Sequence, residues 1–255
     1  MTDPLPRPSD LLTLPLDDWI EWLVKDQMVP ALRPVFQAMQ WPVNQMLGGL
    51  ETGLLAIPFL VFLAVGCALA WRVAGRNVAL FTAASMVFLD MVGIWEESMT
   101  TLSMVLTAVF FCALVGVPLG IWAGRSDRFA AGIRPVLDIM QTTPAFVYLV
   151  PVVMLFGVGM VPGVIATIIF SMPPIIRLTN LGIRQVSGDL VEAGHAFGAT
   201  SRQMLFEIQI PLALRAILAG LNQTLMLSLS MVVIAALIGA EGLGLIVFQG
   251  IGRAG

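Results

Sequence analysis

The side chains that could carry out chemistry are few and scattered along this chain. Its 255 residues include one histidine, His195, and one lysine, Lys25, which lacks the neighbouring Ser or Thr of a phosphate-binding loop. A zinc site needs several histidine, cysteine or acidic ligands gathered in one place, and a Ser–His pair in the membrane needs a histidine there. The sequence therefore predicts no catalytic residue, no metal ligand and no cofactor bound by this chain, which is not expected to hydrolyse ATP by itself.

Two acids and two cysteines lie within apolar runs. Asp90 is interpreted either as a proton or cation site or as a buried carboxylate hydrogen-bonded to Ser or Thr, since intramembrane acids are functional candidates. Asp138 either has such a role, reaches the interface or pairs with Arg134, four residues earlier. Cys67 and Cys112 are interpreted as small apolar side chains, not as a disulfide or a metal pair.

The composition is that of an α-helical integral membrane protein. Hydrophobic residues make up 58% and charged residues 11% of the chain, and its mean hydropathy is +0.92. A soluble domain carries roughly 25% charged residues. The apolar runs are long and unbroken, which favours helices over a barrel. There is no Lys/Arg-rich tract, so nucleic acid is not an expected partner, and no cleaved signal is expected.

Hydropathy divides the chain into a tail, residues 1–48, and a membrane domain, residues 49–255. In the tail, residues 16–29 have helical spacing of apolar side chains, which indicates either an amphipathic helix at the membrane interface or a plain tail helix. The membrane domain is predicted to have six spanning helices, each long enough for a ~30 Å hydrocarbon core. Their expected ranges are 52–71, 77–95, 99–124, 136–158, 161–180 and 212–238.

Arginine content sets the expected topology. The first connection carries Arg72 and Arg76, the third carries three arginines within residues 125–134, and the fifth carries Arg177, Arg184 and Arg202. The second carries two glutamates and the fourth no charge. Basic connections face the cytoplasm. The N-terminus is therefore expected outside, and the polar stretch over residues 187–210 is expected in the cytoplasm.

The third predicted span carries a ridge of small residues at four-residue spacing: Ala108, Cys112, Gly116, Gly120 and Gly124. Such a ridge lets another helix approach closely, so we interpret it as a packing surface.

The cytoplasmic stretch shows the pattern of two short helices around a glycine turn. Asp189 and Glu192 suit a capping box that opens the first helix, and Thr200 and Gln203 suit a second one. Gly198 separates the two. Leu190, Phe197 and either Ala193 or Gly194 are expected on one helix face. That face either enters a groove on a partner or packs in a hairpin on the membrane surface.

This stretch resembles the EAA motif of ABC-importer permeases, which reads Glu-Ala-Ala, three residues, Gly, nine residues, Ile-x-Leu-Pro. Here Glu192-Ala-Gly is followed by His-Ala-Phe, Gly198, nine residues and Ile208-Gln-Ile-Pro211. Gly194 and Ile210 depart mildly from the pattern. The flanking stretches 141–151, 171–180, 222–226 and 238–244 resemble the glycine betaine/proline/choline permeases, so that the resemblance covers roughly residues 45–250.

The resemblance implies an all-α type I ABC importer transmembrane fold and a homodimer in the bacterial inner membrane. Each copy would dock one ABC ATPase subunit, which holds ATP and Mg²⁺, and a separate periplasmic or extracellular binding protein would deliver the substrate. The family usually has a further membrane helix after Gly-Leu-Gly, which we expect to be missing here. The residues implied in ATPase coupling are Glu192, Ala193, Gly194, His195, Phe197, Gly198 and Ala199.

Family substrates are small methylated or quaternary amines, such as glycine betaine, proline betaine, choline or trimethylamine N-oxide. Aromatic faces hold such cations, and prolines interrupt the fourth and fifth spans either as kinks or as the lining of a pathway. The candidate pathway residues are Thr143, Phe146, Tyr148, Phe170, Pro173 and Asn222. The alternative is a secondary transporter of small amines driven by an ion gradient, with Asp90 as its coupling site.

Overall fold

The computed structural model describes residues 29–253, with side chains for Ala38 and residues 40–253. Within this range it is built from helices and contains no strand. In chain order the elements are α3 (Val29–Ala56), α4 (Phe59–Ala74), α5 (Arg76–Val92), α6 (Trp95–Arg125), α7 (Asp127–Thr142), η2 (Ala145–Tyr148), α8 (Leu149–Phe156), α9 (Met160–Arg184), α10 (Gly188–Ala196), α11 (Ser201–Gln203), η3 (Met204–Gln209), α12 (Ile210–Ala235), η4 (Ala236–Ile238) and α13 (Leu243–Arg253). The helix expected over residues 16–29 lies almost entirely outside the described residues.

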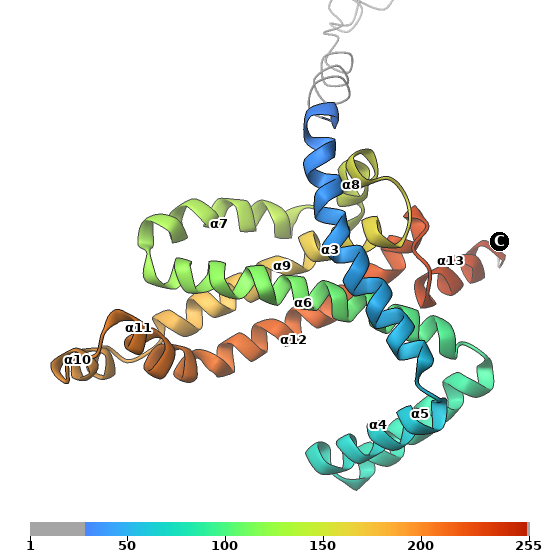
Figure 1. Cartoon of the computed structure of the whole chain (residues 1–255), viewed down its shortest axis with the longest axis horizontal. Coiled ribbons are helices and arrows are strands. Elements are labelled where there is room, and N and C mark those ends of the chain that lie inside the picture. The colour runs from blue at the N-terminus through green and yellow to red at the C-terminus, as the bar shows by residue number, and fades with distance from the viewer. Residues whose placement is uncertain (1–28, 254–255) are drawn as a thin grey trace, which may run out of the picture.

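Three long helices, α6, α9 and α12, form the body of the molecule, and α9 packs against both of the others (Figure 1). The ridge predicted on the third span packs against α9. A Cβ atom added to Gly116 would lie 2.4 Å from Ile175 Cγ2, and one added to Gly120 would lie 2.5 Å from Thr179 Cβ. Ala108 and Cys112 are fully buried. The interpretation of the ridge as a packing surface is confirmed.

Small residues also join α9 to α12. A Cβ atom on Gly182 would lie 2.7 Å from Ala216 Cβ, and one on Gly220 would lie 3.1 Å from Ile175 Cα. Without a hydrophobic driving force between helices in lipid, close backbone approach is what gives dispersion contacts their strength. Helix α9 is thus fixed on two sides by helices that approach it almost backbone to backbone.

Two of the predicted spans are broken. The span expected over 52–71 divides at Pro58 between α3 and α4, which are bent by 99°, and the one expected over 136–158 divides at Pro144, where the bend is 108°. Proline lacks an N–H and disfavours helical geometry at the residue before it, so the chain turns there. Among residues 29–253, three helices are long and apolar enough to cross a membrane, or up to five spans result if each bent pair counts as one. The number six therefore stays a prediction.

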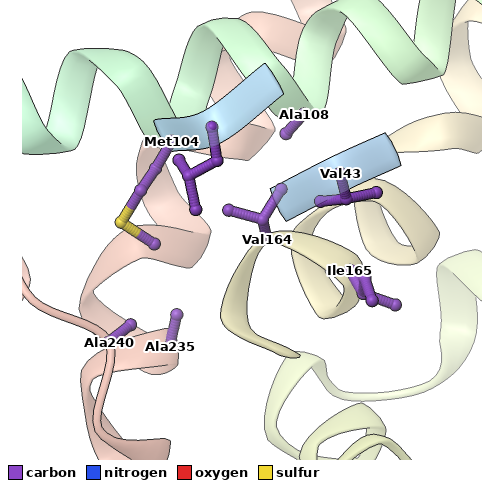
Figure 2. Packing of buried hydrophobic residues seen from close by; sticks show 8 residues of the cluster. Val43, Met104, Ala108, Val164, Ile165, Ala235 and Ala240 are labelled. Atoms are coloured by element: carbon purple, nitrogen blue, oxygen red, sulfur yellow. The ribbon is translucent and has the colours of Figure 1, made fainter. Parts of the chain in front are cut away.

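Helix α3 lies across the long helices rather than beside them (Figure 1). Its Val43 and Leu47 are buried in a cluster with Met104 and Val164, which Figure 2 shows in close view. Gln40 Nε2 also donates a hydrogen bond of 2.9 Å to the Phe156 carbonyl. The expected domain boundary between residues 48 and 49 falls inside this continuous helix.

Helices α4 and α5 form a hairpin that stands off the body (Figure 1). Gly75 makes the turn with a φ of 90°, a conformation that glycine adopts without steric cost. Helix α4 buries none of its side chains, and Ala79 is the buried residue of α5. Asp90 is exposed in the last turn of α5, so its interpretation as a buried carboxylate is wrong.

After α12 the chain turns at Gly239 and Gly242, both with positive φ, and enters α13. The backbone N–H of Leu243 donates a hydrogen bond of 2.8 Å to Thr101 Oγ1, which ties the start of α13 to α6. This 11-residue apolar helix was not predicted, because no element was expected after residue 238.

Candidate functional site

Helix α10 and the turn after it lie at one extreme tip of the molecule (Figure 1). The predicted capping box at Asp189 and Glu192 is wrong, because the N-cap residue is Ser187 and Asp189 already lies in the first turn. There its carboxylate complements the positive end of the helix dipole. The helix begins two residues earlier than the pattern indicated, which leaves Glu192 in its middle and exposed.

A Schellman arrangement ends α10. The N–H groups of Gly198 and Ala199 donate to the carbonyl oxygens of His195 and Gly194, both at 2.9 Å. Gly198 has a φ of 80°, the left-handed conformation that this cap requires and that glycine adopts most easily. The glycine of the pattern is therefore the residue that reverses the chain, and the predicted helix–turn–helix is confirmed.

The second helix begins with the predicted capping box. Gln203 Oε1 accepts a hydrogen bond of 2.9 Å from the Thr200 N–H, and the Gln203 N–H donates to Thr200 Oγ1. This helix then runs through a wider π-helical stretch, η3, directly into α12. Pro211 has no N–H, and its ring would meet the Glu207 carbonyl in a regular helix, so the wider turns relieve that clash. A rigid connection thus links the tip to the long helix.

The two faces of α10 have different environments. Gly194 is buried, and a Cβ atom there would lie 2.6 Å from Met204 Cε and 3.0 Å from Ile208 Cδ1. Leu190, Ala193 and Phe197 are exposed instead, and the Phe197 side chain is 93% exposed. The structure thus assigns Ala193, not Gly194, to the outer face. The inner face packs in the hairpin, and the outer face carries an uncovered aromatic side chain.

Five of the seven predicted coupling residues are therefore accessible together: Glu192, Ala193, His195, Phe197 and Gly198. Gly194 is buried and Ala199 is half-buried, so these two support the geometry of the tip. An exposed aromatic residue on a short helix, supported from behind by a second helix, is suited to filling a pocket on a partner protein. Residues 187–210 include no lysine that could bind a nucleotide phosphate.

The six predicted pathway residues are only partly brought together. Tyr148 and Phe170 meet edge to face with ring centroids 6.1 Å apart, and the Tyr148 hydroxyl donates to the Met140 carbonyl at 2.6 Å. Phe146 is 61% exposed. The remaining three are dispersed: Thr143 donates to the Ile139 carbonyl, Pro173 is buried inside α9, and Asn222 is exposed on α12.

A charged groove with a volume of about 590 Å³ lies between α6, α7 and α9 and was not predicted from the sequence. Arg177 pairs there with Asp138, so the interpretation of Asp138 as the partner of Arg134 is wrong. Arg184 pairs with Asp127 at 2.7 Å. The spacing of these residues could have indicated the groove. Arg177 and Arg184 are seven residues apart on α9, and Asp127 and Asp138 are eleven apart on α7, so each pair lies on one helix face.

The family profile described as "Binding-protein-dependent transport system inner membrane component" matches residues 116–254. This range includes α9, the tip and α12. The chain belongs to this family of ABC-importer permeases and, within it, to the group of glycine betaine permeases. It is 54% identical over 94% of its length to the glycine betaine/proline betaine transport system permease protein ProW of Escherichia coli, of which it covers 68%.

Two further similarities define the relationship. The chain is 45% identical to the glycine betaine transport system permease protein OpuAB of Bacillus subtilis, with 98% of this chain and 86% of that protein covered. Among solved structures, a chain of the MetNI methionine ABC transporter in an inward-facing conformation superposes with a TM-score of 0.55 at 23% identity, over 65% of this chain and 81% of that one. The expected transmembrane fold is confirmed.

Family membership makes this chain a multi-pass permease subunit of the inner membrane. It also implies an ATPase and a substrate-binding protein as partners in general. A transport subunit is consistent with the expectation that the chain is not itself an enzyme.

Proposed function

We propose that this chain is the membrane subunit through which a small methylated or quaternary amine crosses the inner membrane. The relatives support the substrate class: their names specify glycine betaine, proline betaine and carnitine, and a more distant one, 37% identical, is the trimethylamine N-oxide permease TmoV of Ruegeria pomeroyi. Choline belongs to the same chemical class. The import of such an amine is the function that the sequence and the site support best.

The observation that carries the proposal is the exposed outer face of α10. A separate ATPase holds ATP and Mg²⁺ and receives this face, with Phe197 as the central contact. The Gly198 turn and the Thr200 capping box set the angle of α10, and the continuous helix from Ser201 through α12 carries its displacement into the membrane. ATP hydrolysis on the partner then alters the arrangement of the long helices.

The assembly that we propose contains two copies of this chain, each with one ATPase, and a binding protein on the outer side. The N-terminus lies outside, because the arginine-rich connections and the tip of α10 belong on the cytoplasmic side. Lipid covers the apolar surface of the α4–α5 hairpin, whose long apolar side chains are exposed. Tyr148 and Phe170, which are in contact, are the aromatic pair best suited to a passing ammonium group.

The test is transport by proteoliposomes that contain the permease, its ATPase and its binding protein. Phe197→Ala removes the exposed aromatic contact and is expected to lower ATP-driven uptake of glycine betaine about tenfold or more, as truncation of a central interface residue does. Phe206→Ala is the matched control, because Phe206 belongs to the same connection and is also exposed, but lies beside Trp122 rather than at the tip.

Uptake within about twofold of wild type for the Phe197 variant would contradict the coupling role. Co-purification of the ATPase separates loss of docking from loss of the fold. Uptake of the amine that is driven by an ion gradient in vesicles without the ATPase would instead support a secondary transporter and overturn the proposal.

A further inference from the structure

The charged groove between α6, α7 and α9 carries an uneven set of charges. Three arginines and two aspartates line it: Arg134, Arg177, Arg184, Asp127 and Asp138. Two arginines are occupied by the two aspartates. One arginine is therefore left over, and the groove has an excess of one positive charge.

Arg184 is the most firmly held of the three arginines. Its guanidinium donates to Asp127 Oδ1 at 2.7 Å, to Asn180 Oδ1 at 2.8 Å and to the Ala123 carbonyl at 2.8 Å. These acceptors come from α7, α9 and α6, so Arg184 closes one end of the groove by joining its three walls. Each of its three nitrogens already donates a hydrogen bond within the protein, so we interpret it as a structural residue.

Arg134 differs from both paired arginines. Its side chain is exposed to the groove, and across residues 29–253 it has no hydrogen bond or ion pair to a described side chain or carbonyl. Asp138 follows it by four residues on α7, and positions four apart on a helix lie about 6 Å from each other on the same face. The wall formed by α7 thus presents a free guanidinium one turn away from a carboxylate that is itself 56% exposed.

We propose that this groove binds a small zwitterion, with its carboxylate on Arg134 and its methylated ammonium group beside Asp138. Guanidinium groups suit carboxylates because their N–H donors match the two oxygens. A quaternary ammonium group has no N–H to donate, so a nearby carboxylate holds it by electrostatic attraction and no hydrogen bond is required. The volume of about 590 Å³ accommodates a betaine together with water.

This inference rests on the proposed function and specifies its substrate class further. A site whose unpaired charge is a guanidinium favours an amine that also carries a carboxylate. Betaines and carnitine meet that condition, whereas choline, a cation without a carboxylate, does not. Because the groove is open to solvent, binding is expected to weaken as salt is added.

The experiment measures binding of radiolabelled glycine betaine to the purified permease–ATPase complex in the absence of binding protein. Wild type is expected to bind, with unlabelled glycine betaine competing at least tenfold better than choline. Arg134→Gln is expected to weaken binding at least tenfold, and Arg134→Lys less. Arg128→Gln is the matched control, since Arg128 is exposed on the same helix but does not line the groove.

Equal binding by wild type and Arg134→Gln, or equal competition by choline, would overturn the zwitterion site. The zwitterion site would also be overturned if Arg134→Gln changed only the binding of an anionic phospholipid. Thermal unfolding of each complex shows whether a variant is folded. Uptake by the full system distinguishes the two proposals. If the proposed function is right, a complex without this site still imports a methylated amine. A wild-type complex that imports no methylated amine disproves the proposed function.

Discussion

The central helices and the tip around α10 both pack against glycine residues, but they differ in whether the neighbouring atoms can move aside for a larger side chain. At Gly120 the neighbouring atoms belong to the start of a side chain and to the backbone, since an added Cβ would lie 2.5 Å from Thr179 Cβ and 2.8 Å from the Ile176 carbonyl oxygen. At Gly194 the nearest atom, Met204 Cε, is the end of a flexible side chain. The first contact is rigid because a backbone cannot move aside, and the second is adjustable.

This difference matches the proposed function, in which α10 fits the surface of a moving ATPase while α9 keeps its position between α6 and α12. The contact of α9 with α7 is different again, because it combines buried Leu137, which packs with Ile175 and Ile176, with the Arg177–Asp138 pair beside the groove. The same helix therefore has two neighbours joined through small residues and one whose contact is partly charged.

The largest expected effect follows from filling the rigid contact. Gly120→Val would place a branched side chain against Thr179 and the Ile176 carbonyl, neither of which can move without shifting α9. We expect destabilisation of about 3 kcal/mol or more, at the upper end of overpacking, and poor recovery of folded protein. Thermal unfolding of the detergent-purified protein measures it.

Gly132→Val is the control, because Gly132 lies in α7 with nothing within 4 Å of an added Cβ. Both variants pay the same cost for a β-branched residue in a helix, so their difference isolates the contact with α9. Similar melting temperatures for the two variants would show that the rigid contact does not determine the stability of the body.

A smaller effect is expected at the capping box of the tip. Thr200→Ala removes Oγ1, which accepts from the Gln203 N–H, and leaves the start of the second helix without its side-chain cap. The expected cost is about 1 kcal/mol, confined to the tip. Hydrogen exchange should therefore speed up in residues 188–210 and stay unchanged in α6 and α9. Faster exchange in α9 as well would mean that the tip and the body unfold together.

The sequence predicted the regions that depend on local patterns. Four-residue spacing of small residues found the α6–α9 contact, and the Thr200–Gln203 spacing found a helix start, because both features are set within one helix. The break at Pro58 was missed because an average of hydropathy over a span does not detect a change of direction. For the fourth span, the prolines had left a kink or a pathway lining open, and the structure has a bend of 108° at Pro144. The ion pair of Asp138 was missed for a different reason. Its partner Arg177 is 39 residues away and is reached only through the packing of α7 beside α9.

The same limit applied to the candidate coupling site. Its residues were identified by their resemblance to the EAA motif, yet the spacing left open whether Ala193 or Gly194 faces outward. That choice depends on where Ser187 starts α10 and on the side chains of Met204 and Ile208, which belong to the next helix. Tertiary contacts decided it, and no local signal contained them.

The smallest expected effect is at Gly194, and it tests whether the tip is adjustable. Gly194→Ala, which restores the second alanine of the motif, gains up to about 1 kcal/mol of helix propensity but requires Met204 Cε to move from a position 2.6 Å away. Because Met204 can change rotamer, we expect the two terms to offset each other within about 0.5 kcal/mol and ATP-driven uptake to stay near wild type. Gly194→Val adds two further methyl-sized branches against Ile208 and should lower uptake clearly. If the alanine variant were as defective as the valine variant in proteoliposome transport, the contact behind α10 would be as rigid as the one at Gly120, and the contrast between the two regions would be lost.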